Sequence, residues 1–66
     1  MKGYIYSIIN KIDGKRYVGQ TIDLERRKST HFNKLRKNVH PNYLLQNAWN
    51  DWGEENFMFE YEEFEI

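Results

Sequence analysis

The feature that most constrains the fold is a polar turn between two short apolar segments near the start of the chain. Residues 3–6 (Gly-Tyr-Ile-Tyr) and 17–19 (Tyr-Val-Gly) flank the stretch 10–15, which contains Asp-Gly. Apolar runs on either side of such a turn predict an antiparallel β-hairpin. Its loop is either four residues long, over 11–14, or a two-residue turn at 13–14.

The length of this loop decides which side chains face one another. A four-residue loop places Tyr6 opposite Gly19 and Tyr17 opposite Ile8, so that the two tyrosines are diagonal neighbours on one face, about 7–8 Å apart. Because Gly19 has no side chain, space would remain beside the Tyr6 ring, and a pocket lined by two phenols would result. The two-residue turn also keeps both tyrosines on one face, but further apart. Tyrosine is also common in strands for packing reasons alone.

The next segment has a helical period, with Thr21 or Asp23 as its N-cap. At 100° per residue, His31 lies about 20° and Arg27 about 60° from Leu24, which marks the apolar side. Both polar side chains are therefore expected to point toward the apolar seam, one turn apart. A lone His in a seam is usually a hydrogen-bonded core residue, whereas an inward-facing Arg is costly unless it is paired or used. Together, opposite two phenols, they are candidate functional groups.

A second helix is predicted to begin near residues 40–42 and to end at Gly53. Its apolar spacing predicts a wide buried stripe, made up of Leu44, Leu45, Ala48, Trp49 and Trp52. A third strand is expected over about residues 57–64, with Phe57, Phe59 and Tyr61 on one side.

The net charge of the 66 residues is zero, but the charges are segregated. Residues 2–37 hold all ten Lys and Arg and three acids, hence +7, and the remainder holds seven acids and no base, hence −7. This split predicts an anionic partner for the basic part, where cations would contact phosphates without reading sequence. The candidate phosphate contacts are Lys15, Arg26, Lys28, Lys34, Arg36 and Lys37. A solvated helix face is the alternative interpretation.

The composition excludes several classes of protein. A chain of this length forms one small domain, and with no Cys it has neither a disulfide nor a thiolate metal site. No apolar run approaches ~18 residues and no signal-peptide pattern opens the chain, so an intracellular protein outside the membrane is expected.

The order of short motifs resembles the GIY-YIG nuclease superfamily, and especially the catalytic domain of phage-type homing endonucleases. The first signature is Tyr4-Ile5-Tyr6, with Tyr in place of the opening Gly, and the second is Tyr17-Val18-Gly19, with Val in place of Ile. The similarity continues through Gln20-Thr21, Glu25-Arg26-Arg27, His31-Phe32, Leu45-Gln46-Asn47-Ala48, Trp52-Gly53 and Asn56-Phe57. It therefore spans essentially the whole chain.

The resemblance implies an α+β fold, in which helices pack on a three-stranded antiparallel sheet in the order β-β-α-α-β. Residues 1–66 would be one GIY-YIG catalytic domain with a C-terminally incomplete core. In the family a further helix follows, carrying a Glu that binds a divalent metal, Mg²⁺ or Mn²⁺. No residue of this chain matches that Glu, so the metal ligand is expected outside it.

The resemblance also implies roles in the hydrolysis of DNA phosphodiester bonds by in-line attack of water. Tyr6 would be the general base, and Arg27 would stabilise negative charge on the phosphate. A phenol is a poor base at neutral pH, so His31 is expected to relay its proton. Tyr17 would position the water or Tyr6. His40 is a further catalytic candidate, with helix capping as the alternative.

DNA is thus the expected partner, and a separate DNA-binding region would supply the choice of target. The motif series also favours a phage-encoded protein. Two other classes stay open: a catalytically silent nucleic-acid-binding module on the same scaffold, and a protein-interaction domain whose acidic half meets a basic partner.

Overall fold

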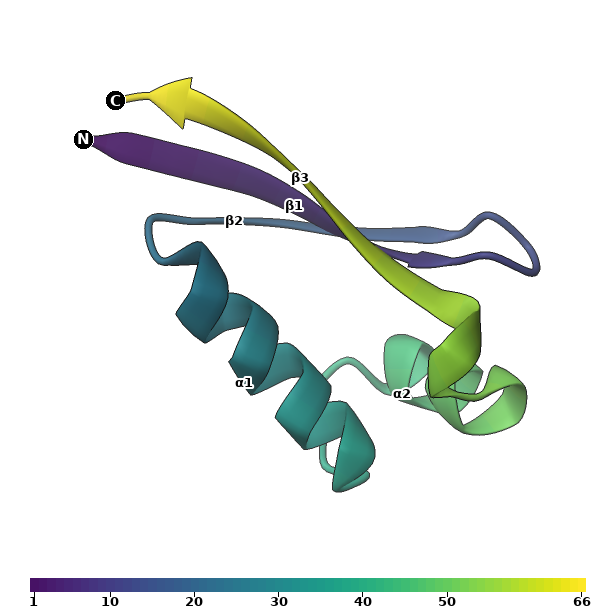
Figure 1. Cartoon of the computed structure of the whole chain (residues 1–66). Helices are drawn as coiled ribbons and strands as arrows, with labels where there is room; N and C mark the ends of the chain where they lie inside the picture. Colours follow the sequence, from purple (N-terminus) through teal and green to yellow (C-terminus); the bar gives the residue numbers. More distant parts are fainter.

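A computed structural model describes all 66 residues and has the expected α+β architecture. In chain order the elements are β1 (Lys2–Asn10), β2 (Arg16–Thr21), α1 (Leu24–Arg36), α2 (Tyr43–Trp52), one turn of 3-10 helix (Glu54–Asn56) and β3 (Phe57–Glu65). Strand β1 is central in the antiparallel sheet β2-β1-β3. Both helices lie on the same side of the sheet (Figure 1). Neither helix is long and apolar enough to cross a membrane.

The β1–β2 hairpin has the four-residue loop and not the two-residue turn. Tyr6 pairs with Gly19, and Tyr17 lies on the same face of the sheet. The N–H of Gly14 donates to the carbonyl of Asn10 at 2.8 Å and closes the loop. Gly14 has φ of 77°, a left-handed conformation that glycine adopts without steric cost.

Helix α1 is defined by signals at both of its ends. Asp23, and not Thr21, is the N-cap. At the other end Asn38 has φ of 62°, and its N–H donates to the Leu35 carbonyl at 3.1 Å. The N–H of Val39 donates to the Lys34 carbonyl at 3.0 Å, which completes a Schellman motif. The chain therefore changes direction directly after α1 and leads into the segment before α2.

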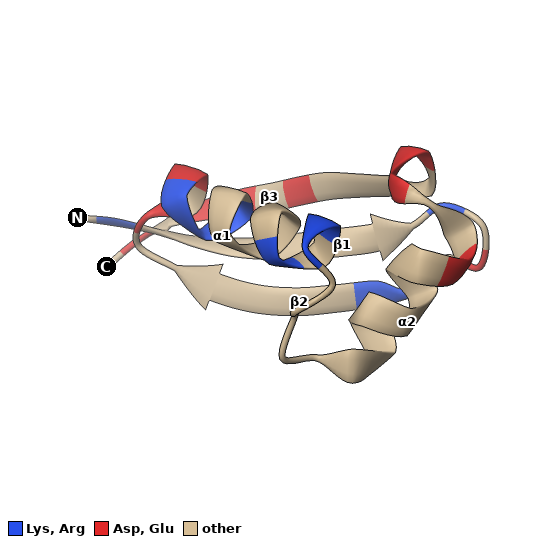
Figure 2. Cartoon of the chain, turned by 90° about the horizontal axis from the view of Figure 1, so that it is seen from below, with Lys and Arg blue, Asp and Glu red and all other residues tan.

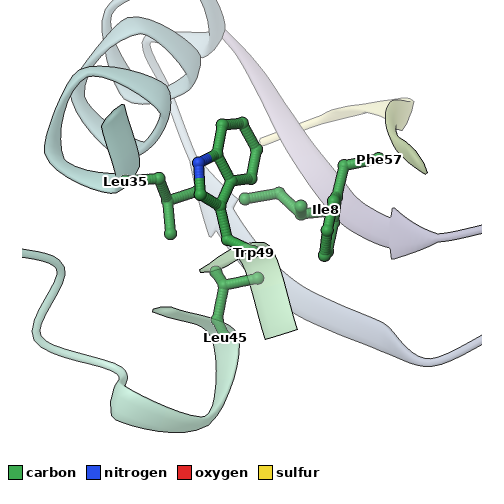
Figure 3. Close-up of a cluster of buried hydrophobic side chains, with 5 residues drawn as sticks. All are labelled: Ile8, Leu35, Leu45, Trp49 and Phe57. Atoms are coloured by element: carbon green, nitrogen blue, oxygen red, sulfur yellow. The ribbon is translucent and has the colours of Figure 1, made fainter. Parts of the chain in front are cut away.

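The hydrophobic core lies between the sheet and the two helices. Its buried side chains, shown in Figure 3, are Ile8, Leu35, Leu45, Trp49 and Phe57. They come from β1, β3 and both helices, and Tyr17 adds a contact from β2. The core thus links every main element of the fold.

The buried stripe of α2 is narrower than the sequence predicts. Leu45 and Trp49 are buried, but Leu44 is 57% and Trp52 45% exposed. Only one side of this helix meets the core, and no second layer covers the other. A wide apolar stripe on a two-layer domain is therefore only partly buried.

Candidate active site

A continuous chain of hydrogen bonds runs from β1 across α1 to the start of α2. Tyr6 Oη lies 2.7 Å from Nε2 of His31. Nδ1 of His31 lies 2.7 Å from Nε2 of His40. Nδ1 of His40 accepts the backbone N–H of Asn42, the N-cap of α2, at 3.0 Å. Three of the predicted catalytic residues are therefore in direct contact, and His40 does not cap the helix itself.

The Tyr6 ring is held in place by both neighbouring strands. It is only 6% exposed, and it stacks on Phe59 of β3 with ring centroids 5.6 Å apart and planes at 15°. On the other side it lies across Gly19 of β2, where an added Cβ would collide with Oη and Cζ of Tyr6. The prediction that space stays open beside Gly19 is thus wrong, because the phenol itself occupies that space.

Gln46 holds the His40 segment against both helices. Its Oε1 accepts the backbone N–H of His40 at 3.0 Å, and its Nε2 donates to the Leu35 carbonyl and to Oδ1 of Asn50, both at 3.0 Å. No role for Gln46 was predicted from the sequence. The feature that could have identified it is a polar side chain on the buried side of α2, next to Leu45.

A pocket of about 380 Å³ opens beside the hydrogen-bonded chain. It is lined by Tyr6, Tyr17, His31 and His40, together with smaller or apolar neighbours from β1, β2, α2 and the segment directly before α2. The predicted pocket with two phenols is therefore present, and two imidazoles complete its wall.

The surroundings of the pocket disfavour charge on these groups. Burial raises the pKa of Tyr6, and the positive charge of Arg27 partly opposes this. Burial, together with the charges of His40, Arg27 and Lys34, lowers the pKa of His31 to about 4. Burial also lowers the pKa of His40. At neutral pH the phenol is protonated and both imidazoles are neutral.

Arg27 lies near the pocket but does not line it. The prediction that its side chain points away from water is wrong, because Arg27 is exposed. It borders a neighbouring hollow of about 510 Å³ at the start of α1. Only the C-terminal half of α1 packs on the core, through Leu35 and Phe32. The helical wheel therefore predicts the direction of the Arg27 side chain but not whether it is buried. His31 is half-buried, as predicted.

The predicted phosphate contacts fall into three groups. Four are exposed on or beside α1 and have no acidic partner: Arg26, Lys28, Lys34 and Lys37. Arg36 already makes a two-pronged pair with Glu54, with Nη2 to Oε2 at 2.7 Å and Nε to Oε1 at 3.1 Å. Lys15 is exposed in the hairpin loop and does not line the pocket.

Part of the charge segregation is satisfied within the molecule. The basic part, residues 2–37, pairs with the acidic remainder through Lys2–Glu63 at 2.9 Å, Arg16–Glu60 at 3.3 Å and Arg36–Glu54 at 2.7 Å. Figure 2 shows bases along α1 and acids along β3. The basic surface that remains unpaired is therefore concentrated on α1.

The donor set of the pocket does not fit a Mg²⁺ site by itself. Hard cations prefer oxygen ligands, usually with at least one carboxylate. The pocket offers phenols and imidazoles but no Asp or Glu. Nowhere in the chain do three His, Asp or Glu side chains gather to hold a metal ion. Glu60 and Glu62 of β3 line a different hollow, together with Ile5 and Ser7.

Comparison with known proteins gives one consistent family. A family model described as the GIY-YIG catalytic domain matches residues 2–65. Over 53 residues the chain is 42% identical to Intron-associated endonuclease 1 of Enterobacteria phage T4, which covers 80% of this chain and 22% of that protein. The chain thus spans about a fifth of the length of this curated relative.

Solved structures agree with this match. The catalytic domain of the homing endonuclease I-TevI aligns with a TM-score of 0.80 at 36% identity, covering 85% of this chain and 60% of that one. A mutant of the same catalytic domain aligns with a TM-score of 0.80 at 38% identity, covering 91% and 61%.

Proposed function

This chain belongs to the GIY-YIG family, and we propose that it acts as a DNA endonuclease domain that hydrolyses phosphodiester bonds. The observation that carries the proposal is the contact of Tyr6, His31 and His40 at the wall of one pocket. Phenol and imidazole groups that are buried, hydrogen-bonded and shifted in pKa are typical of sites that move protons. The similarity to a phage endonuclease supports the same reading and a phage origin.

In this proposal the attacking water loses its proton to Tyr6. The resting phenol has a raised pKa and must first ionise, so the fraction of active base is small at neutral pH. Tyr17, which also lines the pocket, positions the water or the phenol. Arg27 is exposed and close enough to act on Tyr6 by its charge, and it would stabilise the phosphate as negative charge develops.

The basic surface of α1 would hold the DNA backbone. Lys and Arg side chains contact phosphates without reading bases, so this surface gives affinity but no choice of target. Arg26, Lys28, Lys34 and Lys37 have no acidic partner to compete with a phosphate, whereas Arg36 would have to leave Glu54. Because the chain spans only 22% of its relative, we propose that a separate DNA-binding region selects the target.

A divalent metal, Mg²⁺ or Mn²⁺, is part of this proposal because of the family. When bound, such an ion would counter charge on the leaving group. The pocket residues do not supply its ligands, so we expect the carboxylate to come from outside these 66 residues.

A plasmid-nicking assay at large protein excess, with Mg²⁺ or Mn²⁺, tests the function alongside a gel-shift assay of DNA binding. We expect slow nicking that Tyr6→Phe abolishes and that Arg27→Ala reduces by ~10²-fold, as for a missing transition-state cation. Arg26→Ala is the matched control on the same helix. It should weaken binding and its salt dependence while nicking of bound DNA continues.

Two results would argue against this function. If Arg27→Ala and Arg26→Ala behave alike, Arg27 is one phosphate contact among several. If the chain shifts DNA but nicks no faster than Tyr6→Phe, it is a silent nucleic-acid-binding module.

A further inference from the structure

We infer that the backbone N–H of Asn42 sets the tautomers of both imidazoles, so that His31 donates a hydrogen bond to Tyr6 and cannot take the Tyr6 proton. The catalytic meaning of this inference rests on the proposed function. The tautomers themselves do not, because they follow from hydrogen-bond directions alone. In this arrangement His31, His40 and Asn42 are positioning residues for Tyr6.

The direction of the chain is set at its α2 end. A backbone N–H can only donate, so Nδ1 of His40, 3.0 Å from the nitrogen of Asn42, must present its lone pair. A neutral imidazole carries one proton, which His40 must therefore hold on Nε2. A second proton, on Nδ1, would point at the N–H of Asn42, so this contact also favours the neutral ring.

The His31 ring is fixed in the same way. Nε2–H of His40 points at Nδ1 of His31, 2.7 Å away, so that Nδ1 accepts. The single proton of His31 then lies on Nε2, 2.7 Å from Oη of Tyr6. Tyr6 Oη is thus an acceptor from His31. A charged His31 would set two N–H groups against each other at the contact with His40.

The charges around the two rings favour this neutral arrangement. His31 faces Tyr6 on β1, His40 from the loop before α2, and the cations Arg27 and Lys34 on its own helix. No carboxylate lines the pocket to stabilise an imidazolium. Burial and the nearby positive charges lower the pKa of His31 to about 4.

The surrounding structure keeps the imidazole ring of His40 from flipping. Its backbone N–H is bound by Gln46 at 3.0 Å, and its ring stacks on His31 with centroids 5.0 Å apart. Asn42 is fixed in turn because its Oδ1 accepts two N–H groups in the first turn of α2, from Leu44 at 3.1 Å and Leu45 at 3.2 Å. A ring flip would break the contact with Asn42 and the one with His31 together.

This direction changes the part that His31 plays. The hydroxyl hydrogen of Tyr6 is not shared with His31, because Nε2 of that ring already carries a proton. When the O–H bond of Tyr6 breaks, its proton leaves to water in the pocket, and the phenolate keeps the hydrogen bond from His31. The phenolate then accepts a proton from the attacking water. His31 stabilises the base form of Tyr6 and is not its proton relay.

Nitrogen NMR of the free, wild-type chain tests the inference directly. The chain has only two His, so spectra that correlate ring protons with ring nitrogens can be assigned for each. We expect both rings to be neutral at pH 7, with the proton on Nε2 and a bare Nδ1, and His31 to stay neutral well below pH 6. A proton on Nδ1 of either ring, or a His31 that titrates near its ordinary pKa, would overturn the inference.

A pair of variants at Asn42 tests the source of the direction. Asn42→Pro removes the N–H, and the φ of −84° at this position lies near the range of proline. Asn42→Ala loses the side-chain cap but keeps the N–H, so it is the matched control. We expect the Nδ1–H tautomer of His40 to appear in Asn42→Pro and to stay absent in Asn42→Ala. An unchanged His40 tautomer in folded Asn42→Pro would contradict the inference. If that variant does not fold, the wild-type spectra still show whether the predicted tautomers are present.

Titration of the Tyr6 phenol tests the role of His31 as donor. Gln keeps an N–H that can point at Oη but has no basic nitrogen. The titration of Tyr6 should move to higher pH in His31→Ala and much less in His31→Gln. Equal shifts in the two variants would contradict a donor role. These readouts need no DNA, so a failure of the endonuclease proposal would appear separately, as absent nicking in a chain with the expected tautomers.

Discussion

Tyr6 combines two properties that usually exclude each other, since it is almost fully buried and yet lines a pocket. Burial comes from Phe59 on one side and the bare backbone of Gly19 on the other. The hydroxyl end remains at the pocket wall, where His31 contacts it. The exact residue at position 19 therefore matters for the placement of the phenol more than for the strand itself.

Gly19→Ala should displace the Tyr6 ring. The new Cβ would collide with Oη and Cζ of Tyr6. We expect a loss of about 1–3 kcal/mol of stability from overpacking. We also expect the Tyr6–His31 contact to break and nicking to fall at least about tenfold. Urea unfolding, NMR of the two rings and the nicking assay would measure these effects.

Gly14→Ala is the control for that variant. It places a side chain at φ of 77° in open space, so it costs about 1–2 kcal/mol through the backbone and leaves the pocket intact. If Gly14→Ala and Gly19→Ala lose the same activity, the loss reflects stability and not the position of Tyr6.

His31 should make the stability of the chain depend on pH. Its pKa is about 4 in the folded chain, against an ordinary value of 6.5. As pH falls below about 6.5, the unfolded chain binds the proton first, so the free energy of unfolding falls until about pH 4, where the folded chain binds it too. Urea unfolding between pH 4 and 7 would measure the free energy of unfolding of wild type and of His31→Gln. Titration of the acidic residues affects both proteins alike, so it cancels in the difference between the two free energies. A difference independent of pH would contradict the buried, neutral His31.

Helix α2 and the turn before it form the element that orders the site. The Schellman ending of α1 reverses the chain, Asn42 starts α2, and Gln46 ties the His40 segment to the end of α1. None of the atoms of Gln46 lines the pocket. Its contribution is to fix the backbone from which His40 reaches His31.

Gln46→Leu should be strongly destabilising for this reason. It leaves the buried N–H of His40 without its partner, at about 1–3 kcal/mol for an unsatisfied group. The Leu35 carbonyl loses one of its two donors and keeps the N–H of Asn38. Asn47→Leu, on the exposed side of the same helix, is the control and should change stability by about 0.5 kcal/mol or less. Equal unfolding free energies for the two variants would show that the Gln46 contacts are dispensable.

For the helices and strands, predictions from the sequence were correct where they depended on residues that are close together in the chain. Turn residues predict the hairpin and, with either of the two possible loops, the shared face of Tyr6 and Tyr17. The sequence left the register open between these loops, and the structure has the four-residue one. The helical period correctly predicts that His31 points toward the sheet, but it does not predict that Arg27 is exposed. A helical wheel gives the direction of each side chain and does not show which half of the helix packs on the core. Gln46 and the Asn42 contact were missed, since they join segments whose distance only the folded chain determines.

At the scale of the whole molecule, the unpaired cations and the carboxylates lie on different surfaces. Most of its unpaired bases lie on or beside α1. Its acids on β3 pair with Lys2, Arg16 or the N-terminal ammonium, or line a hollow away from the pocket. The chain thus presents the cations that an anionic substrate needs, without carboxylates beside the pocket.

We therefore expect the 66 residues alone to bind DNA but to cut it poorly. Under limiting protein, Mg²⁺-dependent nicking should be barely detectable, because phenols and imidazoles hold a hard cation weakly. Fusing a family helix that carries the metal-binding Glu should raise the rate, and replacing that Glu by Ala should abolish the gain. Efficient turnover by the 66-residue chain, free of contaminating nuclease, would contradict this and direct attention to Glu60 and Glu62.

From the central place of β1 we also expect an order in which the strands assemble. Pairing with β2 is local and forms on the scale of ~1–10 μs, as in other hairpins. Pairing with β3 joins opposite ends of the chain, since Lys2 lies opposite Glu65, and closing so large a loop is slower. Until β3 docks, β1 is an open edge that a strand of another molecule can occupy. Resistance to aggregation during folding therefore depends on the speed of this last pairing.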